Sequence, residues 1–327
     1  MKTTIIGKNA ITLEPNAKKP IGQRLKKYFV DYKNQWELQS MLIPGIIFMI
    51  IFSYIPMYGL AIAFQHYTAL DTFSTAPWVG FENFKIIMTD SFFWESMVNT
   101  LAISFMKLAI GFVTPIILAI MIFELHDGPF KRFVQTVSYL PHFLSWIVLG
   151  GMLITWLSTT GLLNQMLMAV GLLDKPQNFL LDASKYWWIA TISDVWKEVG
   201  WGTILYLAVM SKIDPTYYEA AKMDGANRFG QIWHITIPLM KYIINLNLIL
   251  SVSGIFGSNF DQTLVLMNSQ NQAKAEVLSS YTYRIGMTQG DFSYATAVGL
   301  GMSIVSLILL LASHKITKKL NDNQSVL

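Results

Sequence analysis

The chain has 327 residues, and Lys, Arg, Asp and Glu make up only 13% of them, about half of the roughly 25% usual in soluble domains. Hydrophobic residues reach 53%, which leaves too little polar surface to cover two water-soluble cores. The composition argues against a soluble enzyme, and against a disordered chain, because disorder needs low hydrophobicity and high net charge. We therefore expect an all-α integral membrane protein. The absence of cysteine excludes disulfides and thiolate metal sites.

Six segments are apolar over the roughly 20 residues that an α-helix needs to cross a bilayer. They are residues 41–64, 97–123, 133–157, 187–210, 237–260 and 292–313. Charged residues fall inside the second and fourth segments, so we expect these two helices to pack inside a bundle: Lys107, Asp194, Lys197 and Glu198. Lys107 could equally snorkel to an interface or flank a shifted span. Pro56, Pro115 and Pro141 should kink or break their helices.

The basic residues between these segments predict the orientation, since cytoplasmic loops are enriched in Lys and Arg. The segment before the first span, the loops 124–132 and 211–236 and the C-terminal tail together hold sixteen of them, whereas the alternate loops hold five. Both termini should therefore be cytoplasmic, in a bacterial plasma membrane. We divide the chain into a basic leader, 1–40, and a six-span domain, 41–320. Apolar residues recur at helical spacing between Ile21 and Trp36, which fits a helix lying on the membrane surface; a solvated leader is the alternative.

The loop at 213–238, between the fourth and fifth spans, predicts two short helices. Asp214 is a suitable N-cap before Pro215 at the first helical position, and Gly225 provides the left-handed residue that ends such a helix. A second helix over Asn227 to His234 leads into Pro238. A helix pair that lies flat on the cytoplasmic side is shaped to dock a soluble partner; an ordinary amphipathic loop is the alternative.

The same loop resembles the signature of the membrane-spanning permease subunits of binding-protein-dependent ABC importers. It contains Glu-Ala-Ala at 219–221, then Gly225 after three intervening residues, and Ile-Thr-Ile-Pro at 235–238, with Ile237 where Leu is usual. Further segments resemble the LplB-like sugar and polysaccharide branch: PGIIFMIIFSYIPMYGLAIAF at 44–64, PWVGFENF at 77–84, VQTVSYLPHFLSW at 134–146, SDVWKEVGWG at 193–202 and TYRIGMTQGDFSYATAVGL at 282–300.

This resemblance implies a type I importer permease fold whose cytoplasmic coupling helices sit in a groove on an ATPase. The implied coupling residues are Glu219, Ala220, Ala221, Asp224 and Gly225. The implied partners are a second, related permease, two copies of a cytoplasmic ATPase, an extracellular solute-binding protein, membrane lipid and an oligosaccharide substrate, with no nucleic acid. ATP and Mg would bind to the ATPase and no cofactor to this chain. Exposed residues of the outer loops, among them Tyr281 and Arg284, could meet the binding protein.

Polar residues inside the spans are candidates for a sugar path, because sugars need hydroxyl and amide partners. Asn247, Ser251, Gly254 and Ser258 recur on one helical stripe of the fifth span, with Asn259 and Asp261 at its outer end. Helix packing through small residues is the alternative.

The fourth span adds Trp196, Asp194 and Lys197 as a possible substrate or gating cluster. Asp194 and Lys197, at spacing i,i+3, could instead form a structural ion pair with each other.

The sequence lacks several motifs that are typical of nucleotide-binding and catalytic sites, and this narrows the range of possible functions. The sequence contains no G-x-x-x-x-G-K-[ST], H-E-x-x-H or G-x-S-x-G pattern, so we expect no ATP site, no catalytic residues and no metal site in this chain. The predicted function is passage of an oligosaccharide through an ATP-driven importer. The alternatives are an importer permease for a non-sugar solute and an ion-coupled secondary transporter, which would need no docking loop.

Overall fold

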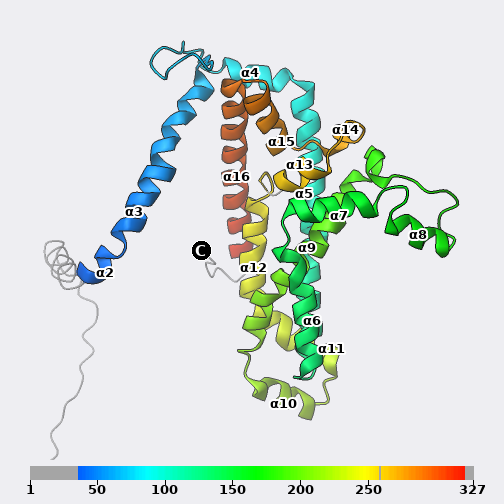
Figure 1. The fold of residues 1–327 in the computed structure, drawn as a ribbon. Coiled ribbons are helices and arrows are strands. Elements are labelled where there is room, and N and C mark those ends of the chain that lie inside the picture. The colour runs from blue at the N-terminus through cyan, green and yellow to red at the C-terminus, as the bar shows by residue number, and fades with distance from the viewer. Residues whose placement is uncertain (1–35, 258, 321–327) are drawn as a thin grey trace, which may run out of the picture. The chain divides into compact units, whose positions relative to one another are not determined.

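The computed structural model describes residues 36–257 and 259–320, and within them the protein is helical, as expected (Figure 1). A single isolated bridge between Gln65 and Trp78 is the β-type pairing in this part of the chain. The chain separates into two compact parts, which meet between Gly59 and Leu60 and are described separately. The predicted surface helix before Trp36 lies outside the described residues, and the division at residue 40 stays a prediction.

The first part contains α2 (Trp36–Ser40), α3 (Ile43–Met49) and η1 (Ile50–Tyr54), and the helix continues as η2 (Ile55–Phe64) into the second part. The run Ile43–Phe64 is long and apolar enough to cross a membrane, as predicted for the first span. Its hydrogen-bond register changes from a π-helix to a 3-10 helix at Ile55, next to Pro56. Proline has no backbone N–H, so the regular helical ladder cannot continue through it.

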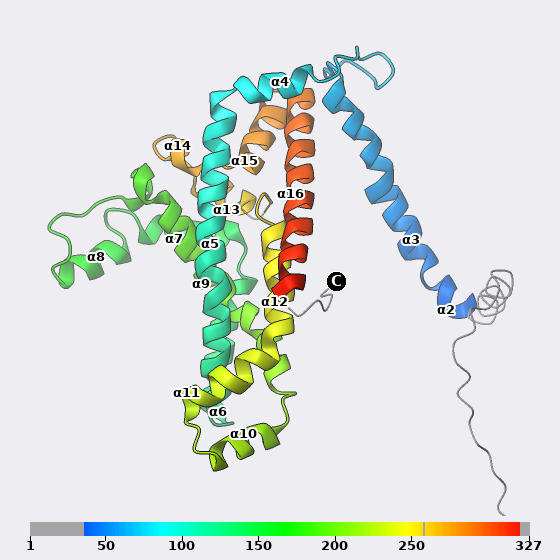
Figure 2. The ribbon, with the colours of Figure 1, turned by 180° about the vertical axis from the view of Figure 1, so that it is seen from behind.

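The second part is built around two long helices, α5 (Ser91–Glu124) and α9 (Tyr186–Met210), which pack side by side along their length (Figures 1 and 2). Asp90 caps α5 by accepting a hydrogen bond from the Phe92 amide. A Cβ on Gly202 of α9 would lie 3.0 Å from the Pro115 ring of α5. Glycine at this position therefore lets the two helices approach closely around the proline.

The predicted third span, 133–157, is not one straight helix. It consists of α6 (Pro129–Tyr139), the turn η3 (Leu140–Phe143) and α7 (Trp146–Trp156), and the helices on either side of the break are bent by 100°. Pro141 interrupts the hydrogen-bond ladder. Ser145 then starts a new helix, since its side chain accepts a hydrogen bond from the Val148 amide.

The predicted fifth span, 237–260, also ends earlier than expected. The helix runs through α11 (Arg228–Gln231), the π-turn η6 (Ile232–Thr236) and α12 (Ile237–Ser253), and Gly254 is its C-cap. The other helices of this part are α4 (Glu82–Thr89), α8 (Leu162–Ala169), η4 (Phe179–Leu181), η5 (Ala183–Lys185), α10 (Pro215–Met223), α13 (Phe260–Leu266), α14 (Gln272–Ala275), α15 (Leu278–Tyr283), η7 (Arg284–Thr288) and α16 (Phe292–Leu320).

By length and composition, fewer helices qualify as membrane spans than the six that the sequence predicted. Within the described residues, four helices are long and apolar enough to cross a membrane, and the bent pair makes a fifth if it counts as one span. The predicted fourth span, α9, has 25 residues but contains Asp194, Lys197 and Glu198. These three charges separate it from the apolar helices.

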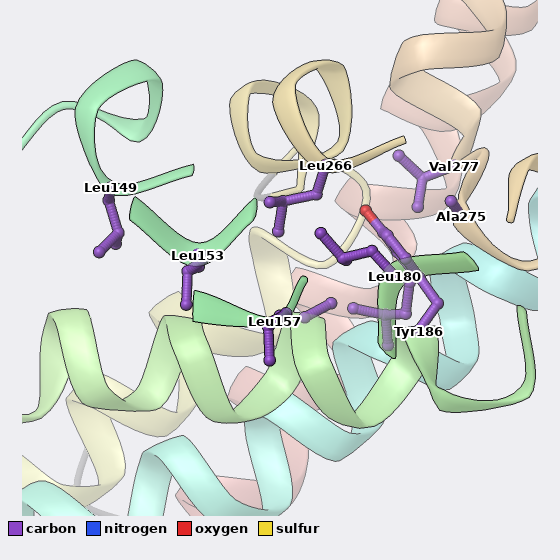
Figure 3. Close-up of a cluster of buried hydrophobic side chains, with 10 residues drawn as sticks. Leu149, Leu153, Leu157, Leu180, Tyr186, Leu266, Ala275 and Val277 are labelled. Carbon is purple, nitrogen blue, oxygen red and sulfur yellow. The ribbon is translucent and has the colours of Figure 1, made fainter. Parts of the chain in front are cut away.

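The buried apolar side chains form clusters at different levels of the second part. One cluster joins α7 to α13 and to the start of α9, through Leu149, Leu153, Leu157, Leu266 and Tyr186 (Figure 3). A Cβ on Gly150 would lie 2.3 Å from Val265, so α7 and α13 are in close contact there. Another cluster packs the C-terminal ends of α5 and α9 against the start of α12, beside the α10 loop. Both ends of the bundle are therefore held by packed side chains.

Candidate functional site

A cavity of about 390 Å³ lies between α5, α9 and α12. Its polar lining comes from all three segments and includes Ser104, Lys107, Asp194, Glu198, Tyr206, Asn247 and Ser251. Gly111, Pro115 and Gly202 leave room where bulkier side chains would fill the space. Hydroxyl, amide and charged groups thus face one partly open volume between these three helices.

The predicted path residues divide into those that line this cavity and those that do not. Asn247, Ser251, Gly254 and Asp194 line it. The helical stripe does not continue beyond Ser253, where α12 ends, and Ser258 lies outside the described residues.

The other predicted path residues have different surroundings. Asn259 is buried and donates to the Ser104 hydroxyl, at 3.0 Å, and Asp261 is exposed. Trp196 packs edge-on against Trp156. None of these residues, nor Lys197, is part of the cavity lining.

The charged residues of α9 are paired differently from the prediction. Asp194 Oδ1 lies 3.0 Å from Lys107 Nζ of α5, so the expected pair of Asp194 with Lys197 is wrong. Lys197 instead contacts its neighbour Glu198 at 2.8 Å and donates to the His142 carbonyl at 2.8 Å. The i,i+3 spacing permitted a local pair, but a buried lysine on the adjacent helix lies closer to the carboxylate.

A second group of side chains joins the helix break to α9. His142 Nδ1 lies 2.7 Å from Glu198 Oε2, and its ring stacks on Trp201 with centroids 4.3 Å apart and planes 4° from parallel. Phe143 adds an edge-on contact to the same indole. These contacts make His142 a packed residue of the bundle. They also hold the 100° bend between α6 and α7 against α9.

The loop between α9 and α12 has the two predicted helices. Asp214 accepts a hydrogen bond from the Thr216 amide and caps α10, and this bond lowers the pKa of Asp214. Gly225 follows α10 with φ of +81°, and Asn227 caps α11 by accepting from the Gly230 amide at 2.8 Å. The helix ends are therefore set by the residues that the sequence indicated.

The outward side of this loop is rich in exposed apolar side chains. Glu219, Ala220 and Asp224 are exposed and Ala221 is half-buried. Around them, Tyr217, Met223, Phe229 and Trp233 are exposed as well, Met223 to 89%. An apolar surface of this kind with a carboxylate in it suits contact with another protein.

The inward side of the loop is attached to the bundle. The Tyr218 hydroxyl lies 3.0 Å from the Thr236 hydroxyl, and Arg228 lies 3.6 Å from Glu124 at the end of α5. A cavity of about 710 Å³ separates α10 from the ends of α5 and α9. The loop is thus connected to the central helices at a few points.

The opposite end of the bundle is held by a cluster on Asp90. The hydroxyls of Tyr281 and Tyr294 both donate to its Oδ2 atom. Burial alone would raise the pKa of Asp90, but these bonds, together with backbone amides, outweigh it and lower the pKa. Tyr281 is buried and Arg284 forms a two-point ion pair with Glu276. Tyr281 is therefore unavailable for the partner contact that the sequence suggested.

Across the described residues, no group of three His, Cys, Asp or Glu side chains is arranged to hold a metal ion. Sequence reasoning missed Ser104 and Tyr206, which line the cavity. It also missed Lys107 as the partner of Asp194. The available signal was that a lysine inside an apolar span needs an acidic partner from another helix.

Residues 111–322 match the family model described as the inner membrane component of binding-protein-dependent transport systems. The chain is 37% identical over 300 residues to a polygalacturonan/rhamnogalacturonan transport system permease protein of Bacillus subtilis, YteP, covering 92% of this chain and 93% of the relative. It is 38% identical over 290 residues to the protein LplB of the same organism, covering 89% and 91%.

Solved structures give a concordant result. A bacterial ABC transporter involved in the import of the acidic polysaccharide alginate contains a chain with a TM-score of 0.82 and 35% identity, covering 90% of this chain and 99% of that one. In a complex of the bacterial alginate transporter with a periplasmic protein that holds an alginate pentasaccharide, the values are 0.82 and 34%, covering 91% and 98%.

Proposed function

The chain belongs to the family of inner membrane components of binding-protein-dependent transport systems, and on that premise we propose that it is one permease subunit of an ATP-driven oligosaccharide importer. The observation that carries this proposal is the pairing of a polar cavity inside the bundle with an exposed two-helix loop at one end of it. The cavity would provide a path for the cargo, and the loop would provide a contact surface for the ATPase. The chain itself contributes no catalytic residue.

An oligosaccharide is the proposed cargo. One relative is named as a polygalacturonan/rhamnogalacturonan transport system permease protein, and the similar solved structure belongs to an ABC transporter involved in the import of alginate. The cavity volume lies in the range of small-molecule sites, about 300–1,000 Å³, and its hydroxyl, amide and carboxylate groups are partners for sugar hydroxyls. We propose that Asn247, Ser251, Gly254 and Asp194 line the path, with Asn259 supporting it through Ser104.

We further propose six spans with both termini in the cytoplasm. The broken helix α6–α7 and the charged helix α9 complete the count, because Lys107 of α5 and His142 of the helix break pair the charges of α9. The basic loops, including the α10 loop, lie on one side, which the positive-inside rule assigns to the cytoplasm. The α10 loop then faces the compartment that contains ATP.

We propose that the ATPase docks on the α10 loop. Glu219 offers a carboxylate to a basic partner, Ala220 and Ala221 permit close approach, and Asp224 and Gly225 form the turn that presents the helix. The complete assembly would hold a second, related permease, two ATPase subunits that bind ATP and Mg, and an extracellular binding protein. Closure of the ATPase pair would move α10, and with it α5 and α9.

The test is reconstitution of the assembly in proteoliposomes with its cognate binding protein. ATP hydrolysis should rise when the binding protein carries an oligosaccharide, and internal sugar should accumulate only with ATP inside the compartment that α10 faces. Ion-driven uptake by this chain alone would overturn the proposal. Stimulation by an amino-acid or peptide cargo, with none by oligosaccharides, would keep the importer and replace the cargo.

A further inference from the structure

A buried polar network crosses from α5 to α9 and α13. Lys107 Nζ lies 3.0 Å from Asp194 Oδ1 and donates to Gln262 Oε1 at 2.7 Å. The Gln262 amide nitrogen donates in turn to the Ala190 carbonyl at 2.8 Å and to the Ser193 hydroxyl at 2.9 Å. Lys107 and Gln262 are 8% and 1% exposed. Three helices that are distant in the chain are therefore joined through one ammonium group and one amide.

This network lies at the end of the cavity that is farther from the α10 loop. Ser104 and Lys107 on α5 and Asp194 on α9 are the lining residues nearest the starts of these helices, whereas Pro115 and Tyr206 line the cavity toward the loop. Eight residues of α5, counted from Lys107, and twelve of α9 separate the two ends, about 12–18 Å at 1.5 Å per residue. A neighbouring contact adds a further connection, because Ser104 of α5 donates to the Ile255 carbonyl, at 2.8 Å, in the segment between α12 and α13.

Stability alone does not explain why charges occupy this position. A buried ion pair often contributes no more than well-packed apolar side chains of the same volume, because both ions lose their hydration. On α13's N-terminal side, the buried Asn259 Oδ1 has no hydrogen-bond partner among the described residues, which costs about 1–3 kcal/mol. Ionisable groups inside a membrane bundle commonly mark elements that change state during transport.

Resting on the proposed function, we propose that Lys107 is the latch that keeps the outer end of the cavity closed, by binding Asp194 and Gln262 at the same time. When α9 and α13 move apart to admit cargo, Lys107 loses one of the two partners. Lys107 is thus a positioning residue that sets how readily the assembly opens without a loaded binding protein. The Lys107 latch thus affects how opening of the cavity is coupled to the loaded binding protein, and does not affect binding of the ATPase.

The test compares ATP hydrolysis by the complete assembly in lipid nanodiscs, with and without the loaded binding protein. The double variant Lys107→Met with Asp194→Asn removes the pair and leaves no buried charge unpaired. Hydrolysis without the binding protein should rise about tenfold, which corresponds to about 1.4 kcal/mol. General destabilisation lowers activity, so a gain in the unstimulated rate separates a latch from a structural role.

The matched control is the exposed pair Lys185 and Asp182, which are 3.1 Å apart within one outer loop. Lys185→Met with Asp182→Asn should leave both rates unchanged. Gln262→Met, which removes only the bridge to α13 and keeps both charges, should raise the unstimulated rate by a smaller factor and serves if the double variant fails to assemble. Unchanged unstimulated hydrolysis in assembled latch variants overturns the latch. A wild-type assembly that no loaded binding protein stimulates overturns the proposed function instead.

Discussion

Gly225 gives the sharpest test of the α10 loop. Its φ of +81° lies in the left-handed region, and no atom lies within 4 Å of the position that a Cβ would occupy. A side chain there collides with nothing in this chain, so its cost comes from the backbone alone. Gly225→Val should therefore leave membrane insertion and the helix bundle intact.

The magnitude follows from that backbone cost. The left-handed region costs an L-residue about 1–2 kcal/mol, and a β-branched residue is among the least tolerant of it. The undocked loop of the Gly225→Val variant can avoid the strain by changing φ, which displaces α10. Docking then has to restore the strained conformation, so the dissociation constant for the ATPase should rise by about 5–30-fold, since 1.4 kcal/mol corresponds to a factor of ten. Gly225→Asn should change it less, because asparagine tolerates the left-handed region.

Titration of the purified ATPase against the permease in nanodiscs measures this constant. Gly171 is the matched control, with φ of +71° and nothing within 4 Å of its Cβ position, in the loop after α8. Gly171→Val carries the same strain away from α10 and should leave the affinity unchanged. Equal affinities for wild type and Gly225→Val, or equal losses for both valine variants, would refute the reasoning.

Further expectations concern contact, packing and charge. Glu219→Lys reverses an exposed charge on α10 and should abolish co-purification of the ATPase while insertion persists. Gly200→Ala would place a Cβ 1.8 Å from the Ser138 carbonyl oxygen, so thermal unfolding in detergent should show a loss of at least about 1–3 kcal/mol, whereas Gly299→Ala, with open space around it, should show little. Because the folded-state pKa of Asp90 is lowered from 3.8, its stabilisation is present above that value and is lost as the pH falls through the folded-state pKa. Asp90→Asn should therefore lower the melting temperature at pH 7 but lose that effect in strong acid.

Local signals predicted the α10 loop well. The cap at Asp214, the left-handed Gly225 and the second cap at Asn227 all act within three residues of their own position, so they are visible in the sequence. The end of α12 was placed seven residues too late, because apolar composition continues past Ser253 while the helix does not. Pro141 indicated a break, but the 100° bend also depends on contacts with α9.

The features that the sequence did not predict depend on contacts between residues that are far apart in the chain, as α9 illustrates. Asp194 is 87 positions from Lys107, and the local alternative Lys197 satisfied the same spacing rule. Each charged group at the centre of a membrane helix costs about 2.5–3.5 kcal/mol on insertion scales, so the three charges of α9 require partners from other helices if α9 crosses the membrane. Lys107 from α5 and the His142 segment from the helix break provide them. The side chains that make α9 an unconvincing span in isolation are therefore the same ones that contact its neighbours, and two of them, Asp194 and Glu198, also line the polar cavity.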